Sequence, residues 1–360
     1  MTSGRSVSST NQPRLPPIAS LQAGRALAAL AVLLYHTNIT LNLPKYLGRD
    51  IAPFFNSGDF GVHFFFVLSG FIICYTHMND VGQTVRLLPF ILKRLRRLIP
   101  ALWATLILVL CAYWLWPALG GADVTIWKIV SAFLILPAER ENLLAVEWTL
   151  RHEVLFYVVF GLIVWSPRVG ISVFCAWLLL SATLPWLEFG FPTSFFFATY
   201  HVLFGLGALT AIAHTKKLVQ WPGTSTVFGV ALFFSAWMLK PFEVNSNFLT
   251  LVLGVGAALI VGGTSELERR GKIRIHRSIL FLGDASYSIY LVHFVAISAM
   301  CKLVMLAPRF VATPDVIAFL VVAGGALMSG IIFYLFVERP LLAALSFRSV
   351  RALHAHAPVN

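Results

Sequence analysis

Ten long apolar runs, spread over almost the whole chain, constrain this sequence more than any other feature. At about 1.5 Å of rise per residue, each is long enough to cross the ~30 Å hydrocarbon core of a bilayer as a helix. The pattern predicts an all-α, polytopic membrane protein with about ten transmembrane helices. The runs cover residues 21–38, 60–78, 98–116, 148–165, 169–187, 195–213, 223–240, 247–264, 279–301 and 315–337.

The composition excludes a soluble fold of this size. Of the 360 residues, 58% are hydrophobic and only 12% are charged, which is too few charges to cover a soluble domain. The net charge of +12 would indicate nucleic acid in a soluble protein. Here the basic residues gather in short loops, so we expect membrane lipid and phosphates as their partners, and no nucleic acid. The four cysteines lie singly in apolar runs without metal-ligand spacing, and we expect no metal.

The distribution of lysine and arginine predicts the topology. An eleventh apolar segment, at about 124–136, covers only about 20 Å and is too short to span. If it does not cross and the N-terminus is cytoplasmic, 19 of the 27 lysines and arginines lie on the cytoplasmic side. If it crossed, 11 of those 19 would move outside, against the positive-inside rule. We therefore expect both termini in the cytoplasm.

The ends of the chain differ from its middle. Residues 1–18 are rich in Ser, Thr and Pro, and we expect a disordered cytoplasmic N-terminus. A cleaved signal peptide with its apolar region near 26–35 is the less favoured reading, because that run is long enough to span. Residues 19–340 form the expected transmembrane domain, and residues 341–360 a cytoplasmic tail.

Ionisable residues inside the apolar runs are costly in a bilayer and are usually functional. Arg25 and His36 are eleven residues apart, close to three helical turns, so both face one way about 16 Å apart along the axis. On the predicted topology, His36, His63, Glu153 and His293 reach one level in the outer half of the membrane, with Arg25 beneath them.

A basic loop is expected below that level, on the cytoplasmic side. It covers residues 93–100 and contains Arg94, Arg96 and Arg97, which form a candidate phosphate site. A donor with a phosphate-rich head would bind there and extend its arm past Arg25 to His36. His36 would be the general base toward an acceptor hydroxyl, and Glu153 would orient it. Coenzyme A has this shape.

Each of these residues also has a simpler interpretation. Arg25 is typical of a residue that snorkels to the headgroups, and the arginine cluster is typical of a positive-inside signal. His36, His63 and His152 are compatible with interfacial positions, and His293 with a satisfied histidine between helices. Small residues such as Ser69, Gly70, Ser286 and Ser288, and tryptophans near helix ends such as Trp148, are more often packing and interfacial residues.

Six segments in order resemble the acyltransferase 3 family of bacterial membrane proteins, over about residues 17–345. The first contains Arg25, ten residues and then His36, and another contains Trp148, Glu153 and Tyr157. The closest resemblance is to the branch that includes exopolysaccharide-production acyltransferases. Thr149 stands where the family more often has Ser. The segments are residues 21–36, 65–71, 94–100, 148–157, 286–293 and 338–340.

The resemblance implies O-acylation, usually O-acetylation, of surface or exported glycans or their lipid-linked precursors at the bacterial inner membrane. It implies acetyl-CoA or another acyl-CoA as co-substrate. It also implies that Arg25 and His36 match an essential pair, Arg94 and Arg97 match essential cytoplasmic arginines, and Glu153 matches the acidic position. Direct transfer and a covalent acyl-His36 intermediate both remain open.

Two rival functions come from other classes of protein. In a proton-coupled transporter, His36, Glu153 and His293 would form a proton relay. Such transporters have broken helices at matching sites in two halves, and the sequence lacks that pairing. The other rival is a non-catalytic scaffold of a polysaccharide export complex. We expect His36→Ala to separate them, because only the enzyme would lose glycan acetyl groups while export continues.

Overall fold

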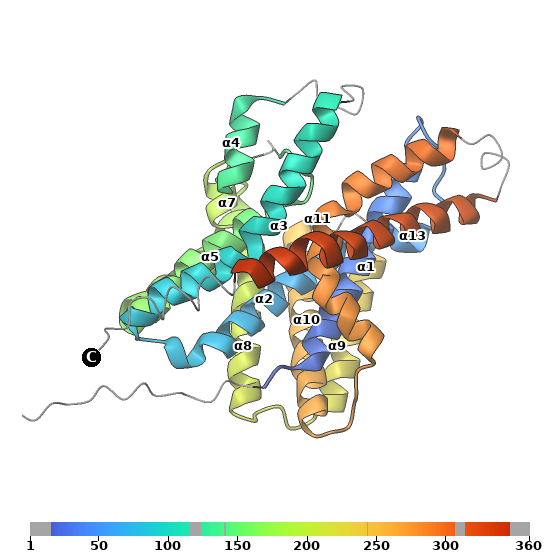
Figure 1. Ribbon diagram of the computed structural model, residues 1–360. Coiled ribbons are helices and arrows are strands. Elements are labelled where there is room, and N and C mark those ends of the chain that lie inside the picture. The colour runs from blue at the N-terminus through green and yellow to red at the C-terminus, as the bar shows by residue number, and fades with distance from the viewer. Residues whose placement is uncertain (1–15, 116–123, 140–141, 243, 307–313, 346–360) are drawn as a thin grey trace, which may run out of the picture.

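The computed structural model describes residues 16–115, 124–139, 142–242, 244–306 and 314–345. The described part is all helical, and a bundle of long helices makes up most of it (Figure 1). The predicted end segments fall mostly outside the described residues, at 1–15 and 346–360. The main helices are α1 (Ala19–Leu41), α2 (Gly61–His77), α3 (Leu87–Leu115), α4 (Ile126–Leu134), α5 (Glu147–Trp165), α6 (Pro167–Thr183), α7 (Thr193–Phe196), α8 (Tyr200–Thr215), α9 (Pro222–Leu239), α10 (Ser246–Arg269), α11 (Arg277–Leu306) and α13 (Asp315–Phe333).

Nine helical stretches of the described chain are long and apolar enough to cross a membrane, and they correspond to nine of the ten predicted runs. The tenth run lies in α1, whose 23 residues extend about 35 Å but carry the polar residues Arg25, His36 and Asn38. Helix α1 is not among the nine candidate spans. The short segment forms α4, which has 9 residues and is not among the candidate spans, as predicted.

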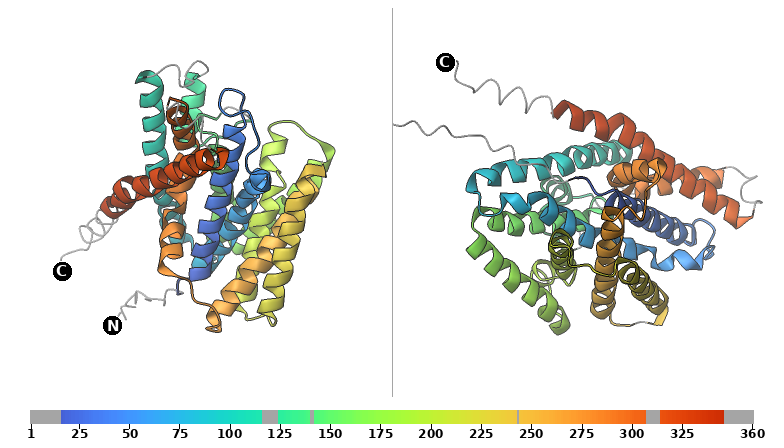
Figure 2. Two further views of the ribbon diagram at one scale, coloured as in Figure 1. Left: turned by 90° about the vertical axis from the view of Figure 1, so that its right-hand side faces the viewer. Right: turned by 90° about the horizontal axis from the view of Figure 1, so that it is seen from below.

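Helix α1 lies inside the bundle, where it packs against α2, α10, α11 and α13 (Figure 2). Its N-terminus is fixed by the carboxylate of Glu268, which accepts hydrogen bonds of 2.7 Å from the backbone N–H groups of Ala19 and Ser20. A carboxylate at this end satisfies free N–H donors and opposes the positive end of the helix dipole. The helix that carries Arg25 and His36 is therefore fixed to α10.

Two glycines allow close contacts between helices. A Cβ on Gly283 of α11 would lie 2.3 Å from the carbonyl oxygen of Gln22 in α1. A Cβ on Gly70 of α2 would lie 2.1 Å from the carbonyl oxygen of Phe204 in α8. Small residues at such contacts are how membrane helices approach one another closely. Gly70 is thus a packing residue, in agreement with its simpler interpretation.

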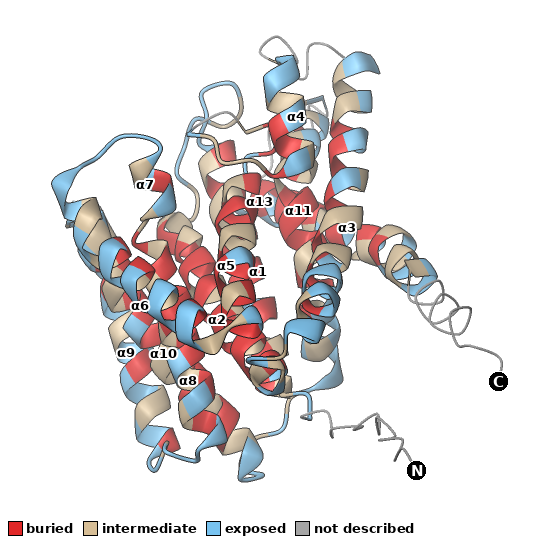
Figure 3. Cartoon of the chain, turned by 90° about the vertical axis from the view of Figure 1, so that its left-hand side faces the viewer, coloured by how far each residue is buried: buried red, intermediate tan, exposed pale blue. Residues whose placement is uncertain are grey.

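Buried residues gather toward the middle of the bundle, whereas outer helices such as α6 and α9 are largely exposed or intermediate (Figure 3). The outer helices α6 and α9 expose large apolar side chains, including Leu179, Val227 and Phe228. In water such a surface would be an association hazard, whereas lipid tails cover it without cost. The described part of the chain is therefore a multi-pass membrane protein.

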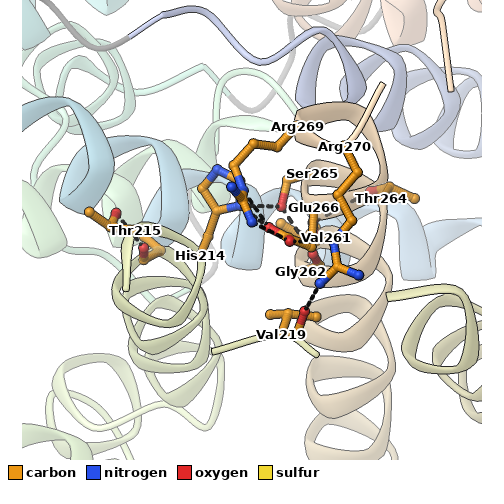
Figure 4. A network of polar contacts seen from close by, with 11 residues as sticks. His214, Thr215, Val219, Val261, Gly262, Thr264, Ser265, Glu266, Arg269 and Arg270 are labelled. Carbon is orange, nitrogen blue, oxygen red and sulfur yellow. Dashed lines mark hydrogen bonds and ion pairs between the residues drawn. The ribbon is translucent and has the colours of Figure 1, made fainter. Parts of the chain in front are cut away.

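A buried ionic cluster joins α8 to α10 at one end of the bundle (Figure 4). Glu266 is fully buried and accepts hydrogen bonds from Arg269 and Arg270, and its carboxylate lies 3.8 Å from Nδ1 of His214. Ser265 lies 3.3 Å from the same His214 nitrogen. A buried carboxylate needs this many partners, and the cluster therefore fixes the two helix ends together.

Candidate functional site

A cavity of about 100 Å³ lies where α1, α2, α3, α5 and α11 meet. Its charged lining consists of Arg25, Arg94, Arg97 and Glu153, and Tyr157 lies beside them. We call it the arginine pocket. Three guanidinium groups against one carboxylate leave an excess of positive charge in a largely apolar setting. Such a pocket favours a ligand with several negative charges.

The helical spacing of α3 explains which arginines enter the pocket. We expected residues 93–100 to be a loop, but they lie within α3, which continues through Pro100. Residues three apart in a helix share a face, so Arg94 and Arg97 both line the pocket. Arg96 faces elsewhere and donates a hydrogen bond of 3.3 Å to the carbonyl oxygen of Leu342. The structure therefore separates Arg96 from the two arginines with which we had grouped it.

Glu153 lies with the arginines rather than with His36. Its carboxylate accepts hydrogen bonds from the hydroxyl of Tyr157, at 2.5 Å, and from Ser69, at 3.2 Å. We had placed Glu153 at the level of His36 as its orienting partner. Apolar runs indicate how long each helix is, but not how far neighbouring helices slide along each other. That slide places Glu153 in the arginine pocket.

A second cavity, of about 220 Å³, contains His36. We call it the histidine pocket. Two further residues that the sequence singled out, His63 and Trp148, line it, together with Asp59 and Tyr200. Asp59 is held by Lys240 at 2.6 Å. The pocket therefore combines a base, a paired carboxylate and aromatic rings, which suits a polar acceptor with apolar faces.

The hydrogen bonds around His36 determine which of its nitrogens is basic. Nδ1 of His293 lies 2.7 Å from the carbonyl oxygen of Tyr290, which can only accept, so that nitrogen carries hydrogen. In neutral His293 the lone pair is then on Nε2, 3.1 Å from Nδ1 of His36. Nδ1 of His36 is also 3.0 Å from the carbonyl oxygen of Val32, so it too carries hydrogen. The lone pair of His36 is therefore on Nε2.

The two pockets share a wall. Val62 and Tyr290 line both of them. The hydroxyl of Thr149 donates to the carbonyl oxygen of Val146, so the Tyr290 hydroxyl must donate to Thr149, at 3.0 Å. This bond holds the Tyr290 ring in the wall. A molecule that reaches from the arginines to His36 has to pass Val62 and Tyr290.

Other histidines lie deeper than we expected. His63 and His152 are 8% and 6% exposed, whereas the simpler interpretation placed them at a membrane interface. His63 lies 3.3 Å from the Thr250 hydroxyl, and Nδ1 of His152 lies 2.9 Å from Nε2 of His201. Helices remote in sequence supply these contacts, which a single apolar run does not reveal, while Nδ1 of His63 is buried without a hydrogen-bond partner among the described residues.

Two residues behind the arginine pocket were not predicted from the sequence. His77, at the end of α2, accepts a hydrogen bond from Arg94, and its other nitrogen lies 2.7 Å from Asp80. Neither residue lies in the middle of an apolar run, so the search for intramembrane charges passed over both. Polar residues at the end of an apolar run are common, and only the fold distinguishes these two.

The bundle thus holds a pocket rich in arginine beside a pocket that contains His36. The family model described as an acyltransferase domain (acyltransferase 3) matches residues 18–335, and the chain belongs to that family. It is therefore a membrane-bound acyltransferase, as the resemblance implied.

Two curated relatives illustrate the family. The exopolysaccharide production protein ExoZ of Rhizobium meliloti (strain 1021) is 32% identical over 311 residues, covering 83% of this chain and 94% of the relative. The peptidoglycan O-acetyltransferase OatA of Listeria monocytogenes serovar 1/2a is 24% identical over 322 residues, covering 77% of this chain and 49% of the relative. No solved structure matches the chain.

Proposed function

We propose that this protein transfers an acyl group, acetyl in the first instance, from cytoplasmic acyl-CoA to a hydroxyl of a surface polysaccharide or its lipid-linked precursor. The observation that carries the proposal is the pair of adjoining pockets. One is rich in arginine, the other is lined by His36, and both are lined by Val62 and Tyr290. A long donor with an anionic head and a reactive tip fits that arrangement.

The arginine pocket is the proposed binding site for the donor's phosphates. Arg97 is exposed, whereas Arg94 is buried, so the pocket reaches the surface at Arg97. Guanidinium groups bind phosphate oxygens through two parallel hydrogen bonds. Arg25 lies further in, on α1, and it would contact the donor's arm where the arm extends toward the shared wall. Glu153 fixes Tyr157 and balances part of the positive charge.

Transfer follows from the position of His36. An acceptor hydroxyl in the histidine pocket gives its proton to Nε2 of His36 as its oxygen attacks the thioester carbonyl. A carbon–oxygen bond forms, the carbon–sulfur bond breaks, and the coenzyme A thiolate takes the proton from His36. Charge on the imidazolium is temporary, so one histidine serves as base and then as acid.

The proposed orientation places the arginine pocket toward the cytoplasm, where acyl-CoA is made. Both termini would then be cytoplasmic in the bacterial inner membrane, as the distribution of positive charge predicts. The names of the relatives support a glycan acceptor, since one concerns exopolysaccharide production and the other peptidoglycan O-acetylation. The acceptor would enter the histidine pocket from the opposite side.

A proton relay for transport is less well supported. It requires His36, His293 and Glu153 in one continuous path. His36 and His293 are 3.1 Å apart, but the hydrogen bonds of Glu153 go to Tyr157 and Ser69 in the other pocket. A scaffold would need neither a pocket rich in arginine nor a histidine in an adjoining pocket.

The test combines cells and purified protein. Mass spectrometry of surface glycans compares cells that lack the protein with cells that produce wild-type protein or His36→Gln. We expect acyl groups on the glycan only with wild-type protein, and normal glycan export in all three. Unchanged acyl content would refute the proposal, and lost export with His36→Gln would favour the rivals. An acyl group trapped on His36 of purified protein without acceptor would replace direct transfer by a two-step route.

A further inference from the structure

Arg94 is held from behind by the end of α2. Its side chain is 5% exposed, and its Nη2 donates hydrogen bonds to Nε2 of His77, at 2.6 Å, and to the Thr76 hydroxyl, at 3.2 Å. Neither Thr76 nor His77 lines the arginine pocket, whereas Arg94 does. The guanidinium group is therefore fixed on the side away from the pocket.

The donor and the acceptor of each hydrogen bond between Arg94 and Asp80 can be assigned. A guanidinium group can only donate, so Nε2 of His77 accepts and the ring's hydrogen lies on Nδ1. Nδ1 then donates to the carboxylate of Asp80, at 2.7 Å. The Thr76 hydroxyl donates to the carbonyl oxygen of Ile72, at 2.6 Å, which leaves its oxygen free to accept from Arg94. Hydrogen bonds thus run from Arg94 through His77 to Asp80.

The surroundings fix His77 as well. The residue is 3% exposed, and the ring of Phe90 packs edge-on against its imidazole with the two ring centres 4.8 Å apart. On the far side of Asp80, Nε of Arg86 lies 4.0 Å from the carboxylate. A carboxylate behind a histidine sets the tautomer and orientation of the ring, as it does behind metal-binding histidines.

One donor of Arg94, its Nε, is buried and has no hydrogen-bond partner among the described residues. Nε and Nη2 lie on the same edge of the planar guanidinium group. Because Nη2 is occupied by His77 and Thr76, Nη1 is the group left to donate to a phosphate oxygen in the arginine pocket. Arg97, by contrast, is exposed and lies in the same pocket without a buried support of this kind.

We propose that His77 and Asp80 are positioning residues of the donor site, which hold Arg94 ready to bind a phosphate group of acyl-CoA. The inference rests on the proposed function. Arg94 then acts as a fixed anchor and Arg97 as a mobile one. Pre-ordering an arginine removes the entropy cost of fixing its long side chain when the ligand binds. Loss of His77 therefore weakens donor binding and leaves the chemical step at His36 intact.

The experiment measures coenzyme A binding by calorimetry, and donor and acceptor kinetics, on the full chain in lipid nanodiscs. For His77→Leu we expect the dissociation constant of coenzyme A and the donor KM to rise about tenfold, because one hydrogen bond to a charged group is lost. The kcat and the acceptor KM should stay unchanged. His77→Gln keeps an oxygen that accepts from Arg94 and should restore much of the affinity.

A matched control variant and a second substitution distinguish a role in positioning Arg94 from a general loss of helix packing. His214 is another buried histidine at a helix end, held by Ser265 and Glu266 (Figure 4), so His214→Leu should leave coenzyme A affinity unchanged. If His77→Leu does not fold, Asp80→Ala tests the same series of hydrogen bonds at its other end, and it should weaken donor binding alone.

Three results would overturn the inference. The first is wild-type affinity in folded His77→Leu or Asp80→Ala, and the second is an equal loss in His214→Leu. The third is a fall in kcat with unchanged affinity, which would place His77 in the chemical step. Wild-type protein that binds no coenzyme A would refute the proposed function and this inference with it. If wild-type protein binds coenzyme A and the His77 and Asp80 variants bind it equally well, only this inference is refuted and the proposed function stands.

Discussion

Two pairs of histidines meet between helices of this protein, and they differ in what surrounds them. His36 of α1 lies 3.1 Å from His293 of α11, and His152 of α5 lies 2.9 Å from His201 of α8. His36 is partly exposed in a pocket next to the arginines. His152 and His201 are buried, and the rings of Phe195 and Trp177 stack on them.

The difference lies in the partners of the remaining nitrogens. In the first pair, the carbonyl oxygens of Val32 and Tyr290 fix the hydrogens and leave the lone pair on Nε2 of His36. In the second pair, Nδ1 of His201 lies 3.3 Å from the Ser181 hydroxyl, which can either donate or accept. Backbone carbonyls thus determine the tautomers of the first pair, whereas the Ser181 hydroxyl leaves the tautomer of His201 open.

The largest expected difference between the pairs is in catalysis. His36→Gln should lower the rate of acyl transfer by about 10²- to 10⁴-fold, because it removes the proposed general base. His152→Gln, in the buried pair, should leave the rate close to wild type. The measurement is transfer of labelled acetyl from acetyl-CoA to glycan by purified protein. Equal losses from the two substitutions would show that both pairs act structurally.

Substitution of an arginine in the arginine pocket should have the next largest effect, on the donor KM. Arg94→Gln should raise the donor KM about 10- to 100-fold, since a hydrogen bond between charged groups contributes about 1.5–3 kcal/mol. Arg96→Gln is the matched control, because Arg96 contacts the Leu342 carbonyl and does not line the pocket. Steady-state kinetics with varied donor distinguish them. A KM raised equally by both would indicate a diffuse effect of positive charge.

The contact between α1 and α11 offers a way to disturb the first pair without altering a polar residue. Gly283→Ala adds a methyl group 2.3 Å from the Gln22 carbonyl oxygen, so the helices must separate. We expect about 1–3 kcal/mol of destabilisation, together with reduced activity. Gly324→Ala, where a Cβ meets nothing within 4 Å, is the control. Thermal unfolding followed by tryptophan fluorescence measures both, and equal stability would contradict the close contact.

His293 should have the smallest effect of the four. In His293→Phe, Nδ1 of His36 keeps its hydrogen bond to the Val32 carbonyl oxygen, so the basic tautomer survives. Removing one ordinary hydrogen bond should lower kcat by about 2- to 10-fold. The same transfer assay measures it. A loss as large as that of His36→Gln would mean that His293 takes the proton itself.

The sequence predicted the helices and most members of the site. Apolar runs determine helix length because a bilayer accepts little else, and nine of the ten runs were found as candidate spans. Arg25, Arg94, Arg97, Glu153 and Tyr157 do meet in one pocket, as an intramembrane charge needs partners.

The relative depth of the helices was beyond the sequence. The length of a helix and the direction of its side chains do not determine its position along the bundle relative to other helices. Glu153 was therefore expected beside His36, whereas the structure places it with the arginines. The arginine run was expected as a loop that precedes the apolar run 98–116, yet it lies inside α3, which begins at Leu87 and continues through Pro100. His77 was missed because its role comes only from contact with Arg94, 17 residues away on another helix.

A structure with coenzyme A bound tests the central claim most directly. The account predicts the phosphate groups against Arg94 and Arg97, the arm beside Arg25, and the sulfur at the wall of Val62 and Tyr290, directed toward Nε2 of His36. Phosphates bound away from the arginine pocket, or a sulfur that ends on the far side of the bundle from His36, would contradict it.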